Sequence, residues 1–168
     1  MPNTIFQTTV RATTAADYAQ TVQFIREQWG EDAVVSRGVL YQPSTLPGFL
    51  AEYDGNIAGL LTYHIKDNEC EIVTIDATQR LLGVGTMRLD AVIEAAKEAG
   101  CHRLWLITTN DNLPALRFYQ RRGFVLVAVH RNAIETSRTL KASIPKIGID
   151  GIPIRDEIEL EIDLRNEK

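Results

Sequence analysis

The segment Glu71–Met87, with the sequence EIVTIDATQRLLGVGTM, constrains the fold of this chain more than any other stretch. It begins as a strand, and Thr86–Ala99 carries a helical apolar stripe. Between the two lies Arg80-x-x-Gly83-x-Gly85. Glycines let backbone N–H groups approach a ligand closely, and a helix N-terminus directs N–H groups and a positive dipole end toward it. The segment therefore predicts an α/β protein with a cradle for a phosphate or pyrophosphate.

Two well-known phosphate cradles do not fit this turn. A dinucleotide fingerprint needs a third glycine at the position of Arg88, and no acidic residue follows at the ribose-binding position. A P-loop needs a lysine before its Ser/Thr, whereas Gly85 directly precedes Thr86. A tight strand-to-helix turn with no ligand stays open as the plain alternative.

The first half of the chain reads as strands around one helix. The pattern predicts a helix over Ala15–Trp29, capped by Thr13 or Thr14. We expect Gly30–Pro47 to be irregular, with a short helix near Asp32–Val35. The predicted strands of this half are Ile5–Arg11, Phe49–Tyr53, Ile57–Ile65 and Glu69–Asp76. In the last of these, period two places Glu69, Glu71, Val73 and Ile75 on one face, and Cys70, Ile72 and Thr74 on the other.

In the second half, strands alternate with helices. The predicted elements are a helix over Thr86–Ala99, a strand over Arg103–Thr108, a helix over Asn112–Arg121, a buried strand over Phe124–His130, a short helix over Asn132–Leu140, a loop over Ser143–Pro153 and a half-exposed last strand in which Ile158, Leu160 and Ile162 alternate with acidic residues. This order predicts an α/β protein with a mixed sheet and helices on both faces. We expect one domain, 1–168, in which 131–168 is a less typical tail.

Composition excludes several classes of function. The 168 residues are 45% apolar and 24% charged, and their net charge of −4 argues against a general nucleic-acid binder. Cys70 and Cys101 form neither a disulfide framework nor a zinc motif, so we expect no metal. The longest apolar run, Phe124–Val129, is too short to span a membrane, and no secretory signal is recognisable. We therefore expect a cytoplasmic protein that binds no membrane.

A second motif follows the next predicted strand. It comprises Asn112, Ala115 and Tyr119, and then Gly123-Phe124. We expect Asn112 to cap the helix that it begins. With Arg80-x-x-Gly83-x-Gly85, this second motif resembles the GNAT superfamily of N-acetyltransferases. That family shows Q/R-x-x-G-x-G/A after a strand, and then Asn-x-x-Ala-x-x-x-Tyr followed by Gly-Phe. The resemblance extends over about 5–129, and it departs from the family at Leu81, where many members have glycine.

The resemblance implies the acyl-CoA N-acyltransferase fold, with a mostly antiparallel central sheet flanked by helices. It also implies transfer of an acetyl group from acetyl-CoA to an amine. The pyrophosphate of coenzyme A would meet the cradle, and its peptide-like pantetheine arm would pair with exposed strand backbone. An N–H near Ile75 would stabilise the oxyanion. The expected coenzyme A-binding residues are Val73, Thr74, Ile75, Arg80, Leu81, Leu82, Gly83, Val84, Gly85, Thr86, Asn112 and Ala115.

Two side chains are the candidate catalysts. Tyr119 shares one helix face with Asn112 and Ala115, and a phenol near pKa 10 can protonate the leaving thiolate. Its alternative role is that of a packed core tyrosine. Glu71, with Glu69 second, is the candidate base that takes the proton of the amine. The alternative for both is a solvated hairpin charge. Neither cysteine has the neighbours that an acyl-enzyme would need.

The sequence leaves the acceptor open between a small-molecule amine and a protein amine, and a homodimer is compatible with it. Trp29, Arg37 and Tyr41 are candidate walls of the acceptor site. The acidic stretch Ile152–Asp163 would form either a rim that favours a cationic amine or a solvated edge strand. One rival function is a non-catalytic acyl-CoA-binding sensor or interaction domain on the same fold. Another is a generic α/β phosphate binder.

Overall fold

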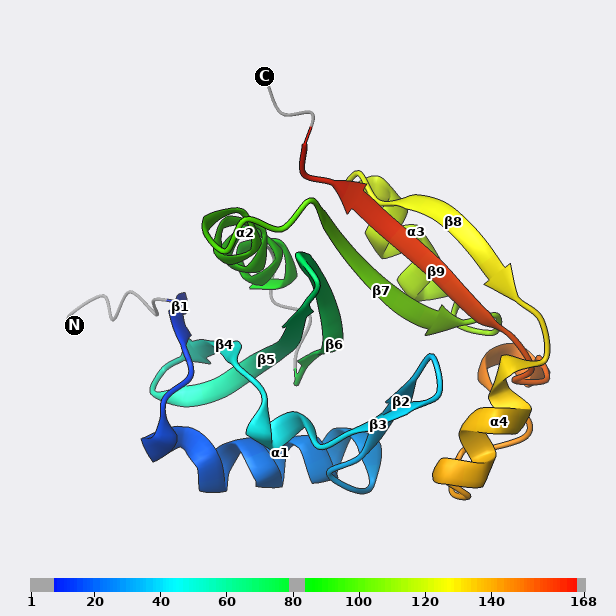
Figure 1. Ribbon diagram of the computed structural model, residues 1–168. Helices are drawn as coiled ribbons and strands as arrows, with labels where there is room; N and C mark the ends of the chain where they lie inside the picture. Colours follow the sequence, from blue (N-terminus) through cyan, green and yellow to red (C-terminus); the bar gives the residue numbers. More distant parts are fainter. Residues whose placement is uncertain (1–7, 79–83, 166–168) are drawn as a thin grey trace.

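The computed structural model describes residues 8–78 and 84–165, which form a layered α/β structure (Figure 1). The strands are β1 (Thr8–Ala12), β2 (Val34–Ser36), β3 (Val39–Tyr41), β4 (Gly48–Tyr53), β5 (Asn56–Lys66), β6 (Glu69–Ala77), β7 (Arg103–Thr109), β8 (Val125–His130) and β9 (Glu157–Asp163). The helices are α1 (Tyr18–Trp29), α2 (Val84–Glu98), α3 (Leu113–Arg121) and α4 (Ala133–Leu140), with short 3-10 helices at Ala15–Asp17, Pro43–Thr45 and Ile149–Gly151. No helix within the described ranges is long and apolar enough to cross a membrane.

The central sheet has seven strands in the order β1-β4-β5-β6-β7-β9-β8. Within it, β6 and β7 run parallel and the other neighbouring strands run antiparallel. The parallel pair arises because α2 carries the chain from the end of β6 to the start of β7. The prediction of a mostly antiparallel mixed sheet is confirmed.

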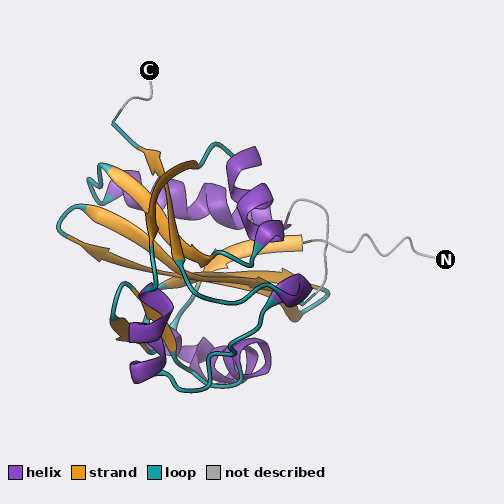
Figure 2. Cartoon of the chain, turned by 90° about the vertical axis from the view of Figure 1, so that its right-hand side faces the viewer, coloured by secondary structure: helices purple, strands orange, loops and turns teal. Residues whose placement is uncertain are grey.

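Helices cover both faces of the sheet, as Figure 2 shows, and each face has its own core. On one face α2 and α3 pack onto the sheet through Leu89, Val92 and Tyr119, among other side chains. On the other face α1 packs Phe24 and Ile25 against β4 and β5. The apolar stripe that the sequence predicts for α2 is buried in the first of these cores. The stripe predicted for α1 was wrong at Tyr18, which is 50% exposed, and the buried apolar side chains of α1 are Phe24 and Ile25.

β6 and β7 separate partway along their length (Figure 1). They pair only where Glu69–Ile72 faces Arg103–Leu106. Beyond that point β6 continues to Ala77 and β7 continues to Thr109. The two strands therefore open like a V, and the backbone of β6 past Ile72 has no β7 partner.

A β-bulge lies in β6 at this opening. Thr62 of β5 faces Thr74 of β6, but the next residue, Tyr63, faces Ile72, so Val73 is the extra residue. A bulge reverses the alternation of side chains beyond it. Ile75 therefore packs into the same core cluster as Ile72. The prediction that Ile75 shares a face with Glu71 was wrong, because period-two counting cannot foresee a bulge.

The segment expected to be irregular contains the β2–β3 hairpin. Ser36 pairs with Val39, which leaves Arg37 and Gly38 as a two-residue turn, both with positive φ (48° and 75°). That geometry suits a tight hairpin. The expected helix near Asp32–Val35 was wrong, because the β-branched Val34 and its successor form strand β2 instead.

The last two strands correct two burial predictions. β8 was expected to be buried, but it is the edge strand beyond β9, and Val125 and Val129 are each 59% exposed. β9 was expected to be half exposed, yet it lies between β7 and β8. Glu157 and Glu159 on it are buried, at 2% and 9% exposure. The solvated edge-strand interpretation of the acidic stretch was therefore wrong.

Candidate functional site

The opening between β6 and β7 is the frame of the candidate site. Val73, Thr74 and Ile75, expected to meet the pantetheine arm, lie on β6 just past its last pair with β7. A strand whose neighbour has moved away can pair with an extended ligand through its backbone. The three residues that the sequence predicts as partners of the pantetheine arm are therefore residues at which β6 no longer pairs with β7.

The phosphate cradle lies only partly within the described chain. Arg80, Leu81, Leu82 and Gly83 lie outside the described residues, and α2 begins at Val84. A Cβ on Gly85 would lie 2.9 Å from Cζ of Phe118, so this glycine lets the first turn of α2 pack closely against α3. The hydroxyl of Thr86 accepts a hydrogen bond from Nε of Arg122 at 3.1 Å. The ends of α2 and α3 are therefore held side by side.

α3 carries the second motif as predicted. Asn112 is its N-cap, and the side-chain oxygen of Asn112 accepts a hydrogen bond from the backbone N–H of Ala115 at 3.2 Å, which confirms the predicted cap. Tyr119 is 7% exposed, and its ring lies 5.3 Å from that of Phe118 and 5.4 Å from that of Phe124. Burial, reinforced by a nearby negative charge at Asp76, raises the pKa of Tyr119. Its phenol is therefore protonated at neutral pH.

Sequence reasoning missed a buried polar junction at the end of β6. Arg88 is 2% exposed and donates to the backbone oxygens of Leu60, at 3.1 Å, and Asp76. Nε1 of Trp29 donates to Oδ2 of Asp76 at 2.7 Å. The sequence did hold a sign of this junction, because Arg88 directly precedes Leu89 on the buried side of α2. The junction ties α1 and α2 to β6.

Glu71 is buried beneath the β2–β3 hairpin. Its side chain accepts hydrogen bonds from the hydroxyls of Ser36 and Tyr41, the latter at 3.0 Å, and it is 4% exposed. Burial raises the pKa of Glu71, the two hydrogen bonds oppose that rise, and the nearby charges of Glu157 and Glu159 add to it. Glu71 is therefore not a solvated hairpin charge.

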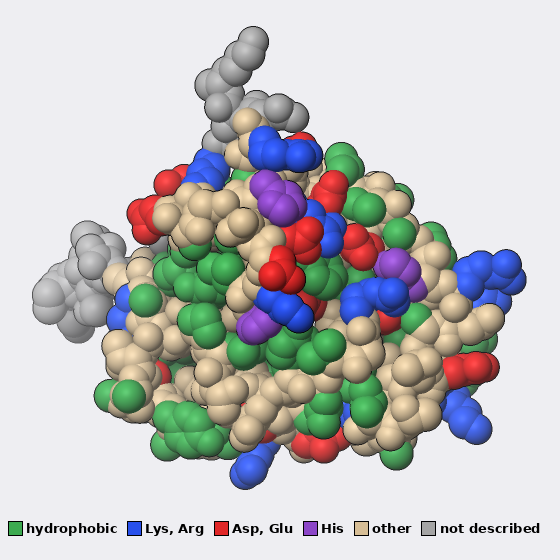
Figure 3. Space-filling view, in the orientation of Figure 1, with side chains coloured by type: hydrophobic (Ala, Val, Ile, Leu, Met, Phe, Trp, Pro, Cys, Tyr) green, Lys and Arg blue, Asp and Glu red, His purple; other side chains and the backbone are tan. Residues whose placement is uncertain are grey.

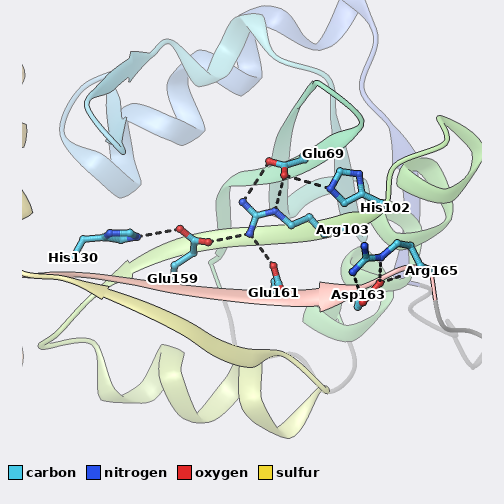
Figure 4. Close-up of polar contacts among 8 residues, drawn as sticks. All are labelled: Glu69, His102, Arg103, His130, Glu159, Glu161, Asp163 and Arg165. Carbon is cyan, nitrogen blue, oxygen red and sulfur yellow. Dashed lines mark hydrogen bonds and ion pairs between the residues drawn. The ribbon is translucent and has the colours of Figure 1, made fainter.

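Glu69 belongs to a network of charges centred on Arg103 of β7 (Figure 4). The Arg103 guanidinium lies 3.1 Å from Glu69, 2.9 Å from Glu159 and 2.8 Å from Glu161. His130 contacts Glu159 at 3.0 Å. Figure 3 shows acidic, basic and histidine side chains gathered over this part of the sheet. The acidic side chains of β9 are thus part of an ion-pair network that spans four strands, β6, β7, β9 and β8, and they do not form a free rim.

The cysteines take no part in this arrangement. Cys70 and Cys101 are free and buried, and burial raises the pKa of Cys70 to about 12. Cys70 is therefore not a thiolate at neutral pH. Among the residues that the structure describes, no group of three or more His, Cys, Asp or Glu is placed to hold a metal ion.

The three expected wall residues of the acceptor site line different cavities. Trp29 lines one of about 690 Å³ between α1, β2 and α4. Tyr41 and Glu71 line one of about 130 Å³. Arg37 lines one of about 450 Å³ beside the start of α4, and it also pairs with Glu157 at 3.2 Å. Of these three residues, only Trp29 both lines a cavity large enough for a drug-sized ligand and contacts the end of β6, through its hydrogen bond to Asp76.

Two relatives resemble this chain over most of its length, and a third resembles part of it. A Bacillus subtilis (strain 168) protein, YdhI, is 43% identical over 136 residues, covering 80% of this chain and 85% of YdhI. A second protein of that strain, YxbD, is 38% identical over 143 residues, covering 84% and 90%. A streptothricin acetyltransferase from Streptomyces lavendulae is 33% identical over 75 residues, covering 42% of this chain and 40% of the enzyme.

Solved structures share the fold. An IAA acetyltransferase from Bacillus cereus superposes with a TM-score of 0.67 at 18% identity, covering 94% of this chain and 99% of the other. A GNAT family acetyltransferase from Elizabethkingia anophelis with acetyl-CoA bound gives 0.66 at 22% identity, covering 93% and 97%. The sequence model of the acetyltransferase (GNAT) family matches residues 10–124. This match spans both the opening of β6 and β7 and the helix that carries Tyr119, and the chain belongs to the GNAT acetyltransferase family.

Proposed function

We propose that this protein is an N-acetyltransferase that moves an acetyl group from acetyl-CoA directly to an amine. The observation that carries the proposal is the separation of β6 from β7 past Ile72, with Tyr119 buried on the helix that follows β7. An opening of this kind gives an extended cosubstrate a strand to pair with and a proton donor beside it. A relative of the same fold has acetyl-CoA bound, which supports the same reading.

The cosubstrate would be held mostly by backbone. The strand Val73–Ile75 would pair with the pantetheine arm, and an N–H near Ile75 would stabilise the oxyanion. Arg80 and the N–H groups of the segment from Leu81 to Thr86 would hold the pyrophosphate. Asn112 and Ala115 at the start of α3 complete this side of the site.

The transfer needs two proton movements. The amine nitrogen attacks the carbonyl carbon of the acetyl group, the new C–N bond forms, and the C–S bond breaks with its electron pair going to sulfur. Tyr119 donates its phenolic proton to the departing thiolate, which leaves as coenzyme A. Burial keeps that proton on Tyr119 until sulfur takes it.

Glu71 takes the proton that the amine must lose. Glu71 directly precedes Ile72, the last residue of β6 that pairs with β7. Its carboxylate accepts hydrogen bonds from the hydroxyls of Ser36 and Tyr41. Burial raises the pKa of Glu71 and thereby makes it a stronger base than an exposed glutamate. The hydroxyl of Tyr41 lines the same cavity and would relay the proton.

We take 1–168 to work as one catalytic domain that includes the tail 131–168. The support is β9, because this strand of the tail lies between β7 and β8 in the central sheet. The acceptor is an amine of a small molecule or of a protein. Homodimerisation stays a prediction.

Release of thiol from acetyl-CoA in the presence of a panel of amines tests the proposal. We expect thiol release that depends on the amine, together with an N-acetylated product identified by mass spectrometry. Coenzyme A should raise the melting temperature. Tight binding of coenzyme A with no transfer to any amine would instead support the acyl-CoA sensor. Stabilisation by another nucleotide but not by coenzyme A would support a generic phosphate binder.

A further inference from the structure

The cavity of about 690 Å³ lies where the end of α1, strand β2 and the tail meet. Trp29 forms the wall from α1 and Val34 the wall from β2. Ile134 of α4 and Lys141, the C-cap of that helix, face them from the tail, and Thr109 closes the side toward the sheet. Its volume is within the range of roughly 300–1,000 Å³ that is typical of small-molecule sites.

This cavity adjoins the opening between β6 and β7 from both sides. Thr109 is the last residue of β7, three positions beyond Leu106, where pairing with β6 ends. Trp29 reaches β6 through its hydrogen bond to Asp76. A molecule in the cavity therefore lies against the diverging ends of both strands. It lies on the face that α1 covers, opposite the face on which α2 packs.

The tail wall of the cavity is fixed in place. Arg138 of α4 donates to the backbone oxygens of Ile144, Pro145 and Ile154, at 3.3, 2.7 and 2.9 Å. Lys141 donates to the backbone oxygen of Ala33 at 2.8 Å, and this bond ties α4 to the start of β2. Held in this way, the tail forms a fixed wall of the cavity.

The walls of the cavity combine apolar side chains with polar ones and one half-buried cation, Lys141. Valine, isoleucine, proline and tryptophan make up seven of the fourteen lining residues. The ammonium of Lys141 lies 5.7 Å from the centre of the Trp29 ring, and burial lowers the pKa of Lys141, an effect that the nearby charge of Glu31 opposes without cancelling it. Glu31, which also lines the cavity, is exposed and already accepts a hydrogen bond from Ser143 at 2.7 Å. A partly desolvated ammonium has more to gain from an anionic partner than one in water.

We propose that this cavity is the acceptor site and that it takes a small primary amine with an apolar body and a carboxylate, the carboxylate meeting Lys141. The proposal rests on the acetyltransferase function and names its substrate class. The indole of Trp29 packs on the apolar body, and the amine faces the opening between β6 and β7. Polyamines and protein N-termini should be poor acceptors. The second ammonium group of a polyamine would be repelled by Lys141, and a polypeptide would overlap the tail.

The first test measures kcat/KM for acetyl transfer to phenylalanine, phenethylamine, spermidine and a short peptide. We expect phenylalanine to exceed phenethylamine by about tenfold, a factor typical of one charge-assisted hydrogen bond. Lys141→Met should remove that preference while transfer to phenethylamine persists. The control is Lys146→Met, which changes an exposed lysine outside the cavity and should keep the preference. A preference for spermidine or the peptide, or one that survives Lys141→Met, overturns the proposal.

The second test measures binding without turnover. The chain has two tryptophans, so Trp105→Phe leaves Trp29 as the sole indole emitter. In protein saturated with coenzyme A, phenylalanine should change the emission of Trp29 saturably, and Lys141→Met should weaken that binding. Saturable binding without any acetyl transfer would contradict the proposed enzyme function, while still supporting the cavity as a site for a ligand of this class. No change in emission, together with no preference for phenylalanine, overturns the acceptor-class proposal itself.

Discussion

The phenolic hydroxyl of Tyr41 donates a hydrogen bond to Oε2 of Glu71 at 3.0 Å. The bond joins strand β3 of the hairpin to strand β6 of the central sheet, 30 residues apart. Burial, with help from the charge of Glu71, raises the pKa of Tyr41 to about 12. The phenol is therefore a permanent donor at neutral pH, and it stabilises the ionised form of Glu71 relative to the protonated form.

Tyr41→Phe should move the acidic limb of the pH profile of kcat/KM to higher pH. A hydrogen bond to the carboxylate lowers the pKa of Glu71, so its loss raises that pKa. The expected shift is about one pH unit, because a hydrogen bond to a charged group contributes about 1.5 kcal/mol or more. Tyr63→Phe, on the opposite face against Phe49, is the control and should leave the profile in place. An unchanged limb in both Tyr41→Phe and Glu71→Gln would exclude Glu71 as the base.

Tyr119→Phe should lower kcat by about 10²–10⁴-fold, the usual contribution of a general acid. Phenylalanine keeps the ring between Phe118 and Phe124, so the melting temperature and the Kd of coenzyme A should stay close to those of the parent. Tyr18→Phe, at a tyrosine that is 50% exposed, is the matched control. Equal turnover in Tyr119→Phe and the parent would show that Tyr119 only packs in the core and is not the general acid.

Arg103→Met should destabilise the fold by about 3 kcal/mol at pH 7, because it leaves Glu69, Glu159 and Glu161 facing one another without their shared cation. Burial by itself raises the pKa of Glu159, but hydrogen bonds from Arg103 and His130 outweigh it, and the net pKa is lowered. A lowered carboxylate pKa stabilises the fold above the unfolded value, about 4.3, and this contribution is lost as the pH falls through the folded pKa.

The difference between Arg103→Met and the parent should therefore shrink below about pH 4, as measured by urea unfolding across pH. Arg165→Met is the control, since its ion pair with Asp163 lies at the surface, with the Arg165 side chain 68% exposed. It should leave the free energy of unfolding unchanged. A deficit in Arg103→Met that is independent of pH would mean that lost packing, not lost charge, is responsible.

Gly85→Ala should destabilise the fold by about 1–3 kcal/mol despite the better helix propensity of alanine, because the new methyl meets the ring of Phe118 at 2.9 Å. Phe118→Leu removes the ring atoms that clash. In a double-mutant cycle, Gly85→Ala should cost less in the Phe118→Leu background than in the parent. Equal costs in the two backgrounds would show that the glycine serves the adjoining cradle rather than the packing of α2 on α3.

Local patterns predicted most elements and both motifs, because strand and helix periodicities and caps are properties of neighbouring residues. The cap at Asn112 and the helical stripe of α2 are examples. The β2–β3 hairpin was missed because three-residue strands carry almost no periodicity. The exposure of β8 depends on β9 inserting beside it from residues 157–163, which no local pattern contains.

The polar part of the site depends even more on tertiary contacts. Glu157 and Glu159 looked solvated because their compensating partners are distant in sequence: Arg37 lies in the β2–β3 turn and Arg103 on β7. The bulge at Val73 reversed the face of Ile75, and the link between Trp29 and Asp76 spans 47 positions. The sequence therefore predicts individual residues for the cofactor side, and only segments for the acceptor side.

A crystal structure with coenzyme A bound would show directly where the cosubstrate lies. We predict that the pantetheine arm pairs with Val73–Ile75 in the opening between β6 and β7. We also predict that the sulfur lies within about 3.2 Å of the hydroxyl of Tyr119, or one water away, and faces the cavity lined by Trp29 and Lys141. Coenzyme A bound elsewhere, or a sulfur that points away from both Tyr119 and that cavity, would contradict the proposed mechanism.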